Sequence, residues 1–164
     1  MPIAKITDVA KYIYNEYEKM SHTTIDEMKL HKLLYLAQRE SLAITNEPLF
    51  DGDFEGWRYG PVSREIRTEF NQNRLSVPVK LSLEVKYIVD NILSQYGFYE
   101  TWKLSELTHK ETSWLKSRKG LSSDESSANV MELNDIRADA IKVRPYDSVW
   151  DMYYDEFEDV EESD

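Results

Sequence analysis

The stretch that decides the fold is KLHKLLYLAQRESLAI, residues 29–44. Its apolar residues recur every three or four positions, which is typical of one face of an α-helix. The main stripe consists of Leu30, Leu33, Leu34, Ala37, Ser41 and Ile44, and a second stripe of Met28, Tyr35 and Leu42. Because apolar residues occupy more than half of the circumference, we expect a central helix that is packed on several sides.

The ends of this central helix are also marked. Thr24 and Glu27 have the spacing of a capping box, which predicts that the helix begins just after Thr24. Asn46 and Pro48 predict its end. The segment before it has helical spacing over roughly residues 8–20, with Thr7 as the expected N-cap.

Further helices are expected towards the C-terminus. Ser82 is expected to cap a helix with an unbroken apolar stripe up to Tyr96, and Gly97 is expected to be its left-handed C-cap. Asn134 is expected to cap a later helix. Shorter helices are predicted around residues 104–107 and 114–115, and a last amphipathic one over 146–157.

Residues 49–66 have a different character, because turn residues alternate with aromatic ones. Asp51-Gly52 predicts a turn that two short strands could flank. Gly60-Pro61 predicts a change from extended chain to helix, since proline is favoured at the first helical position. The sum is a mainly α fold, a compact single-domain helical bundle with one or two short extended or β segments.

The charge of the chain is unevenly distributed. The formal net charge is −11, and eight of the 31 acidic residues lie from Asp151 onward, where Lys and Arg are absent. Residues 1–150 therefore hold 23 acids and 20 bases, a net charge of −3. We expect one domain over residues 1–154 and an acidic C-terminal tail over 155–164.

Several classes of chemistry lack the residues that they need. The chain has no Cys, its five Gly form no phosphate-binding run, and His22, His31 and His109 lack metal-ligand spacing. We therefore expect no catalytic residues, no cofactor, no metal site and no enzymatic activity. The N-terminal residues resemble neither a signal peptide nor a membrane helix, so we expect a cytoplasmic protein that makes no use of membranes.

Two groups of residues suggest binding instead. Arg58, Tyr59, Arg64 and Arg67 cluster in sequence, although acidic residues interleave with them and weaken the case for a nucleic-acid surface. The acidic end carries aromatic side chains at Tyr153, Tyr154 and Phe157. This end is interpreted either as a solvated terminus or as a segment that contacts a basic partner surface.

Joined motifs over residues 29–66 resemble the Panacea domain, the SocA-like antitoxin family. The resemblance is carried by Lys32-Leu33-Leu34-Tyr35, by Pro48-Leu49-Phe50 and by Trp57 through Gly60-Pro61-Val62. A second block is similar to the family at Leu104, Leu107, Thr108-His109 and Trp114. His31 and Gly56 depart from the residues that are usual at those positions.

The resemblance implies an antitoxin that neutralises a protein toxin, usually encoded beside it, by direct contact and without a cofactor. Two alternatives stay open: an adaptor that delivers the toxin to an AAA+ protease, and a DNA-binding transcriptional regulator. For the first of these three functions we expect Arg58, Tyr59 and Arg64 to lie near the partner surface while Trp57 packs inward.

Overall fold

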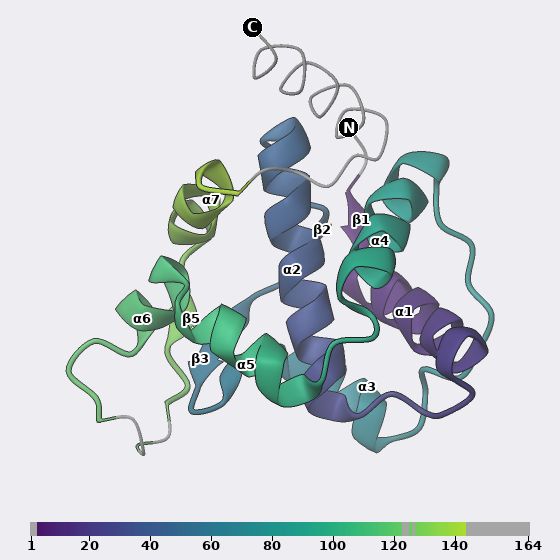
Figure 1. Cartoon of the computed structure of the whole chain (residues 1–164), viewed down its shortest axis with the longest axis horizontal. Helices are drawn as coiled ribbons and strands as arrows, with labels where there is room; N and C mark the ends of the chain where they lie inside the picture. Colours follow the sequence, from purple (N-terminus) through teal and green to yellow (C-terminus); the bar gives the residue numbers. More distant parts are fainter. Residues whose placement is uncertain (1–2, 123–124, 126, 144–164) are drawn as a thin grey trace, which may run out of the picture.

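The computed structural model describes residues 3–122, 125 and 127–143, and these are mainly helical, as predicted (Figure 1). The helices are α1 (Ile6–Ser21), α2 (Glu27–Thr45), α3 (Arg64–Asn71), α4 (Leu83–Tyr96), α5 (Thr101–His109), α6 (Thr112–Ser117) and α7 (Leu133–Ile141). The strands are β1 (Ala4–Lys5), β2 (Phe50–Asp51), β3 (Phe54–Trp57), β4 (Gly60–Val62) and β5 (Val130–Met131).

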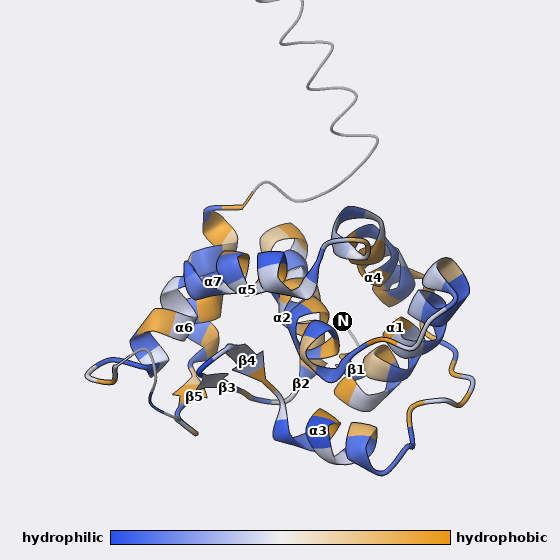
Figure 2. Ribbon diagram, turned by 60° about the horizontal axis from the view of Figure 1, so that its bottom comes forward, coloured by the Kyte–Doolittle hydropathy of each residue, from blue (hydrophilic) through white to orange (hydrophobic). Residues whose placement is uncertain are grey.

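Helix α2 is the centre of the described structure, as its sequence predicts. Every residue from Lys29 to Leu42 is buried, and α1, α4, α5 and α7 all pack against it. Figure 1 shows α1 and α4 on one side of α2 and α6 and α7 on the other. In Figure 2, α3 and the β3–β4–β5 strands lie beneath α2. A helix covered on all sides explains why its apolar residues extend around most of its circumference.

The short strands form two small sheets. Strand β1 pairs in parallel with β2, and β3 lies between β4 and β5 in an antiparallel sheet. The two strands that flank Asp51-Gly52 therefore exist but belong to different sheets. The Gln38 side chain supports β2 from α2, because its amide oxygen accepts from Leu49 N–H at 2.8 Å and its amide nitrogen donates to the Phe50 carbonyl at 3.1 Å.

Three predicted N-caps are wrong. Helix α2 is capped by Asp26, whose carboxylate accepts from Lys29 N–H at 2.8 Å, so Thr24 lies outside the helix. Helix α1 begins before Thr7 because its preceding residues are held in β1 against β2. Helix α7 follows Glu132, which places Asn134 inside the helix. Local spacing identified these helices but placed each N-cap two residues too early or too late.

For helix α4, the predicted N-cap is confirmed and the predicted C-cap is wrong. The Ser82 side chain accepts from Val85 N–H at 3.4 Å, as expected of an N-cap. Gly97 is not left-handed, however, since its φ of −58° continues the helical conformation, and its N–H bonds to the Leu93 carbonyl. The predicted short helices at 104–107 and 114–115 correspond to α5 and α6.

A buried polar network joins the helices on the α7 side of α2. Arg39 of α2 forms an ion pair with Glu111, just before α6. Asp139 of α7 accepts from Thr112 N–H at 2.8 Å and from Ser113 N–H at 2.9 Å, so it caps α6 from another helix. The Tyr35 hydroxyl donates to the same carboxylate at 3.3 Å. These bonds fix α6 relative to α2 and α7.

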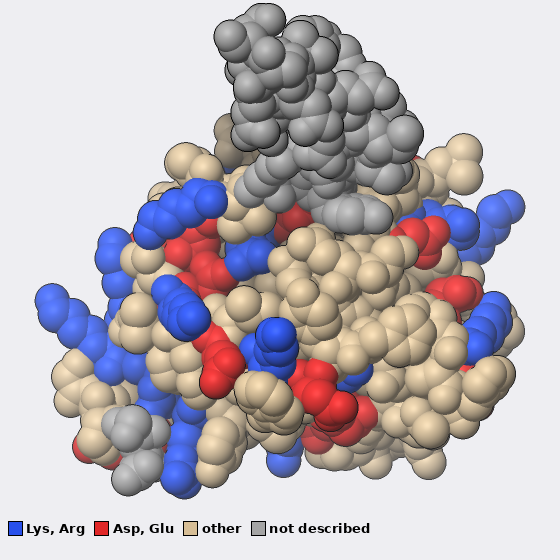
Figure 3. All heavy atoms as spheres, in the orientation of Figure 1, with Lys and Arg blue, Asp and Glu red and all other residues tan. Residues whose placement is uncertain are grey.

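The predicted helix over 146–157 and the acidic tail over 155–164 lie outside the described residues. Within the described part, no helix is both long and apolar enough to cross a membrane. On the face in Figure 3, Lys and Arg gather towards the α6 side with acidic residues between them, while uncharged surface prevails near α4.

Candidate functional site

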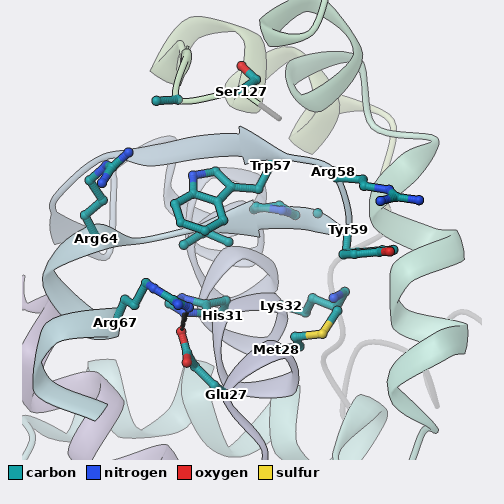
Figure 4. Close-up of a pocket in the computed structure, with 14 residues that line it drawn as sticks. Glu27, Met28, His31, Lys32, Trp57, Arg58, Tyr59, Arg64, Arg67 and Ser127 are labelled. Carbon is teal, nitrogen blue, oxygen red and sulfur yellow. Dashed lines mark hydrogen bonds and ion pairs between the residues drawn. The ribbon is translucent and has the colours of Figure 1, made fainter. Parts of the chain in front are cut away.

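A pocket of about 610 Å³ opens between the N-terminal half of α2 and the β3–β4 hairpin. The first turns of α3 and the segment before β5 complete its wall. Figure 4 shows Trp57 in the middle of this wall, with Arg64 and Arg67 to one side and Lys32 and Tyr59 to the other. From α2 come Glu27, Met28, His31 and Lys32.

The hairpin is built around a two-residue turn. Trp57 and Gly60 are paired across β3 and β4, which leaves Arg58 and Tyr59 as the turn. Tyr59 is 53% exposed, and the Arg58 guanidinium lies over its ring at 4.9 Å. Gly60 adopts a φ of +132°, and a Cβ there would come within 3.3 Å of Lys32 Cε. The absence of a side chain at Gly60 therefore allows the turn to pack closely against α2.

This hairpin corrects the prediction for Gly60-Pro61. Both residues belong to β4, and helix α3 begins later, at Arg64, with the Ser63 side chain accepting from Ile66 N–H. Proline is compatible with this position because β4 is an edge strand. No strand pairs with its outer side, so the missing N–H of proline costs no hydrogen bond there. Pro61 is paired with Gly56 of β3.

Trp57 is half-buried and lies in the pocket wall rather than in the core. Its indole N–H donates to Glu55 Oε1 at 2.9 Å, and the Arg64 side chain donates to the same carboxylate at 2.8 Å. The guanidinium groups of Arg64 and Arg67 lie 5.5 and 5.4 Å from its ring. Both distances allow cation–π attraction, so two cations lie close to the indole.

A chain of three hydrogen bonds through four residues holds the α2 side of the pocket. Ser63 N–H donates to His31 Nδ1 at 3.2 Å, so the ring hydrogen lies on Nε2, which contacts Glu27 Oε2 at 3.0 Å. Arg67 donates to the same oxygen at 2.8 Å. The bond from His31, against the effect of burial, lowers the pKa of the Glu27 carboxyl. An ionised carboxylate therefore ties α2 to α3.

Lys32 is the most unusual residue of the site. Its side chain is 2% exposed, and within the described part of the chain its ammonium has neither a hydrogen bond nor an ion pair. Burial lowers its pKa from 10.5 to about 8, with Asp26 acting weakly in the opposite direction. Since buried charges are normally paired, this ammonium at the pocket surface is a candidate anion-binding group.

His109 lies behind the same turn. Its ring stacks on Trp114 at 4.3 Å, and burial, followed by the nearby Lys32 charge, lowers its pKa. His22 is exposed at the C-cap of α1, and His31 is buried in the site. Among the described residues, no three His, Asp or Glu side chains form a group that could hold a metal ion.

The structure brings together four of the residues predicted to bind a partner: Arg58, Tyr59, Arg64 and Arg67 all line the pocket. The other three, Tyr153, Tyr154 and Phe157, lie outside the described residues. The predicted partner surface of Arg58, Tyr59 and Arg64 is exposed.

The sequence analysis missed Lys32, His31 and Glu27 as site residues. Two signals were present in the sequence: Glu27 and His31 are four residues apart on α2, and Lys32 interrupts an apolar stretch. A carboxylate four residues from a histidine faces the same way on a helix. Nothing in the sequence indicated that the hairpin would cover this face.

The pocket of this mainly helical fold is thus lined by Arg and aromatic side chains. The family model described as antitoxin SocA-like, Panacea domain, matches residues 30–115. The chain therefore belongs to this family, which confirms the resemblance inferred from the motifs. No curated protein and no solved structure matches the chain.

Proposed function

We propose that this protein is an antitoxin that neutralises a cognate protein toxin by direct contact through the pocket and the exposed Arg58–Tyr59 turn. Membership of the antitoxin SocA-like family carries the proposal. The matched segment contains the whole hairpin and the His31 and Lys32 positions of α2. The segment by which the family is recognised therefore includes most of the residues that form the pocket.

The chemistry of the pocket is that of a protein interface. Arg, Tyr and Trp are the residues that most often dominate binding energy at such interfaces. Here Tyr59 and Arg58 project from a short turn, and Trp57 lies beside them in the wall (Figure 4). A toxin segment that enters the pocket would bury all three side chains at once.

Three further parts of the proposal follow from the sequence. The protein acts by binding and without catalysis, it works in the cytoplasm, and residues 1–154 form a single compact helical domain. The eight acidic residues from Asp151 onward, most of them in the 155–164 tail, provide a negatively charged segment that would favour a toxin with a basic surface.

The test is co-expression of the chain with the product of its neighbouring gene, with growth and co-purification scored together. Rescue of growth with a stable complex supports the proposal. Rescue with loss of the toxin from the cells would instead identify a proteolytic adaptor. A shift of promoter DNA that weakens steeply with salt would identify a transcriptional regulator. No rescue and no complex would overturn the antitoxin assignment.

A matched pair of variants locates the interface. Arg58→Ala combined with Tyr59→Ala removes two exposed side chains of the turn, and we expect toxin affinity to fall at least about tenfold. The control is Lys86→Ala, an exposed residue of α4 whose ion pair with Asp90 lies away from the pocket. Unchanged binding by the folded double variant would show that the turn is not in the interface.

A further inference from the structure

We propose that the pocket receives an acidic side chain of the toxin, with the carboxylate placed against the Lys32 ammonium and an adjacent apolar side chain against Trp57. This inference rests on the proposed function, since it specifies which part of the toxin the pocket recognises. Its three supports are the unpaired buried cation, the charge of the lining and the apolar wall.

The first support is the contrast between Lys32 and the other cations of the pocket. Arg64 pairs with Glu55, and Arg67 pairs with Glu27. Lys32 is more deeply buried than either, yet within the described residues its ammonium forms neither a hydrogen bond nor an ion pair. A ligand carboxylate would supply the missing partner.

The second support is the sign and number of charges in the lining. Among the described residues of the lining, the cations are Lys32, Arg58, Arg64 and Arg67 and the carboxylate is Glu27, while Glu55 beside the pocket pairs with Arg64. This excess is positive in a chain whose formal net charge is −11. Arg64 and Arg67 already have carboxylate partners in Glu55 and Glu27, so the single ammonium of Lys32 is matched by one singly charged ligand carboxylate.

The third support is the apolar part of the pocket between Lys32 and Arg67. Trp57 presents its ring there, and Met28, Pro61 and Val62 complete the apolar lining. A volume of about 610 Å³ holds a few side chains of a peptide. The pocket therefore fits an acidic residue that has a Leu, Met or aromatic residue next to it.

The experiment titrates the purified protein with two capped peptides, Ac-Ala-Leu-Asp-Ala-NH₂ and the otherwise identical Asn peptide. Amide NMR shifts of Trp57, Gly60 and Val62 report binding. We expect the Asp peptide to bind at least about tenfold more tightly than the Asn peptide. Equal shifts for both peptides, or none at millimolar concentration, would overturn the inference. So would saturable binding of inorganic phosphate that is tighter than that of the Asp peptide.

Two lysine variants make the test specific. In Lys32→Met the preference for Asp over Asn should disappear, whereas in Lys29→Met it should persist, because the Lys29 ammonium contacts Tyr17 and not the pocket. The melting temperature of Lys32→Met should not fall below that of the wild type. A preference that survives in Lys32→Met contradicts the inference.

The toxin complex gives an independent readout. If the complex forms, Lys32→Met should weaken it at least about tenfold while Lys29→Met leaves it unchanged. Complex formation that Lys32→Met does not affect would overturn the inference and leave the proposed function intact. Absence of any complex would count against the proposed function alone, since the peptide titration does not involve the toxin.

Discussion

At the scale of single residues, Lys32 carries a measurable cost in stability. Burial lowers its pKa from 10.5 to about 8, so the folded protein holds this ammonium less favourably than the unfolded chain does. We expect Lys32→Met to raise the free energy of unfolding at pH 7 by up to about 3 kcal/mol, measured by urea denaturation. If Lys32→Met is more stable than the wild type but binds its ligand more weakly, then Lys32 contributes to binding at the expense of stability.

The same cost has a defined pH dependence. Between about pH 8 and the ordinary lysine value of 10.5, the unfolded chain binds more protons at this site than the folded protein does. The contribution of Lys32 to stability should therefore improve as pH rises through this range. Lys32→Met should lack this improvement, whereas Lys29→Met should retain it. Parallel stability curves for wild type and Lys32→Met would contradict the assignment.

Gly56 gives a second prediction at this scale. A Cβ there would overlap Ser117 Oγ of α6 and lie 3.1 Å from Ser117 Cβ, so strand β3 leaves no room for a side chain unless Ser117 moves. Gly56→Ala should destabilise the protein by about 1–3 kcal/mol. In a double-mutant cycle, Ser117→Ala should reduce this penalty because it removes the clashing hydroxyl. Strictly additive effects would show that the two sites do not meet.

At the scale of elements, the sequence predicted which segments are helical better than it predicted where they begin. Periodicity identified α2 and α4 because it reflects the faces that they bury. The first residue of α2 depends on a tertiary contact: Asp26 caps the helix with one carboxylate oxygen and accepts from the Thr101 hydroxyl of α5 with the other at 2.8 Å. Thr24 has an equally suitable side chain, and spacing alone could not choose between them.

This choice of cap is testable. Asp26→Ala should lower the free energy of unfolding by about 1 kcal/mol or somewhat more, because it removes both the cap and the link to α5. Thr24→Ala should have almost no effect, since Thr24 is exposed and outside the helix. Thermal denaturation of the two variants compares them directly. A larger loss for Thr24→Ala would restore the capping box that the sequence suggested.

The candidate site could be predicted only in part, for a related reason. Arg58, Tyr59, Arg64 and Arg67 are close in sequence and meet because one hairpin and one short helix carry them. Lys32 joins them only because α2 passes under the hairpin at Gly60. Such a contact between distant segments has no signature in local spacing.

At the scale of the whole molecule, Asp139 connects elements that are far apart in the chain. Burial tends to raise the pKa of this carboxyl, but the hydrogen bonds from Ser113 and Thr112 outweigh it and lower the pKa. Asp139→Asn should destabilise the protein by about 2–3 kcal/mol at pH 7, measured by denaturant unfolding. The loss should shrink as pH falls below the ordinary aspartate value, because the wild type then also loses its charge. A pH-independent difference would show that the charge is not responsible.

The position of α7 has a consequence for how such a module passes between genes. The segment by which the family is recognised ends at residue 115, yet the helix that begins at Thr112 takes its N-terminal cap from residue 139. A gene fusion or recombination event that joined new sequence directly after residue 115 would leave the N–H groups at the start of α6 without their acceptor. A chain that keeps this cap must therefore extend at least to residue 139, beyond the segment that identifies the family.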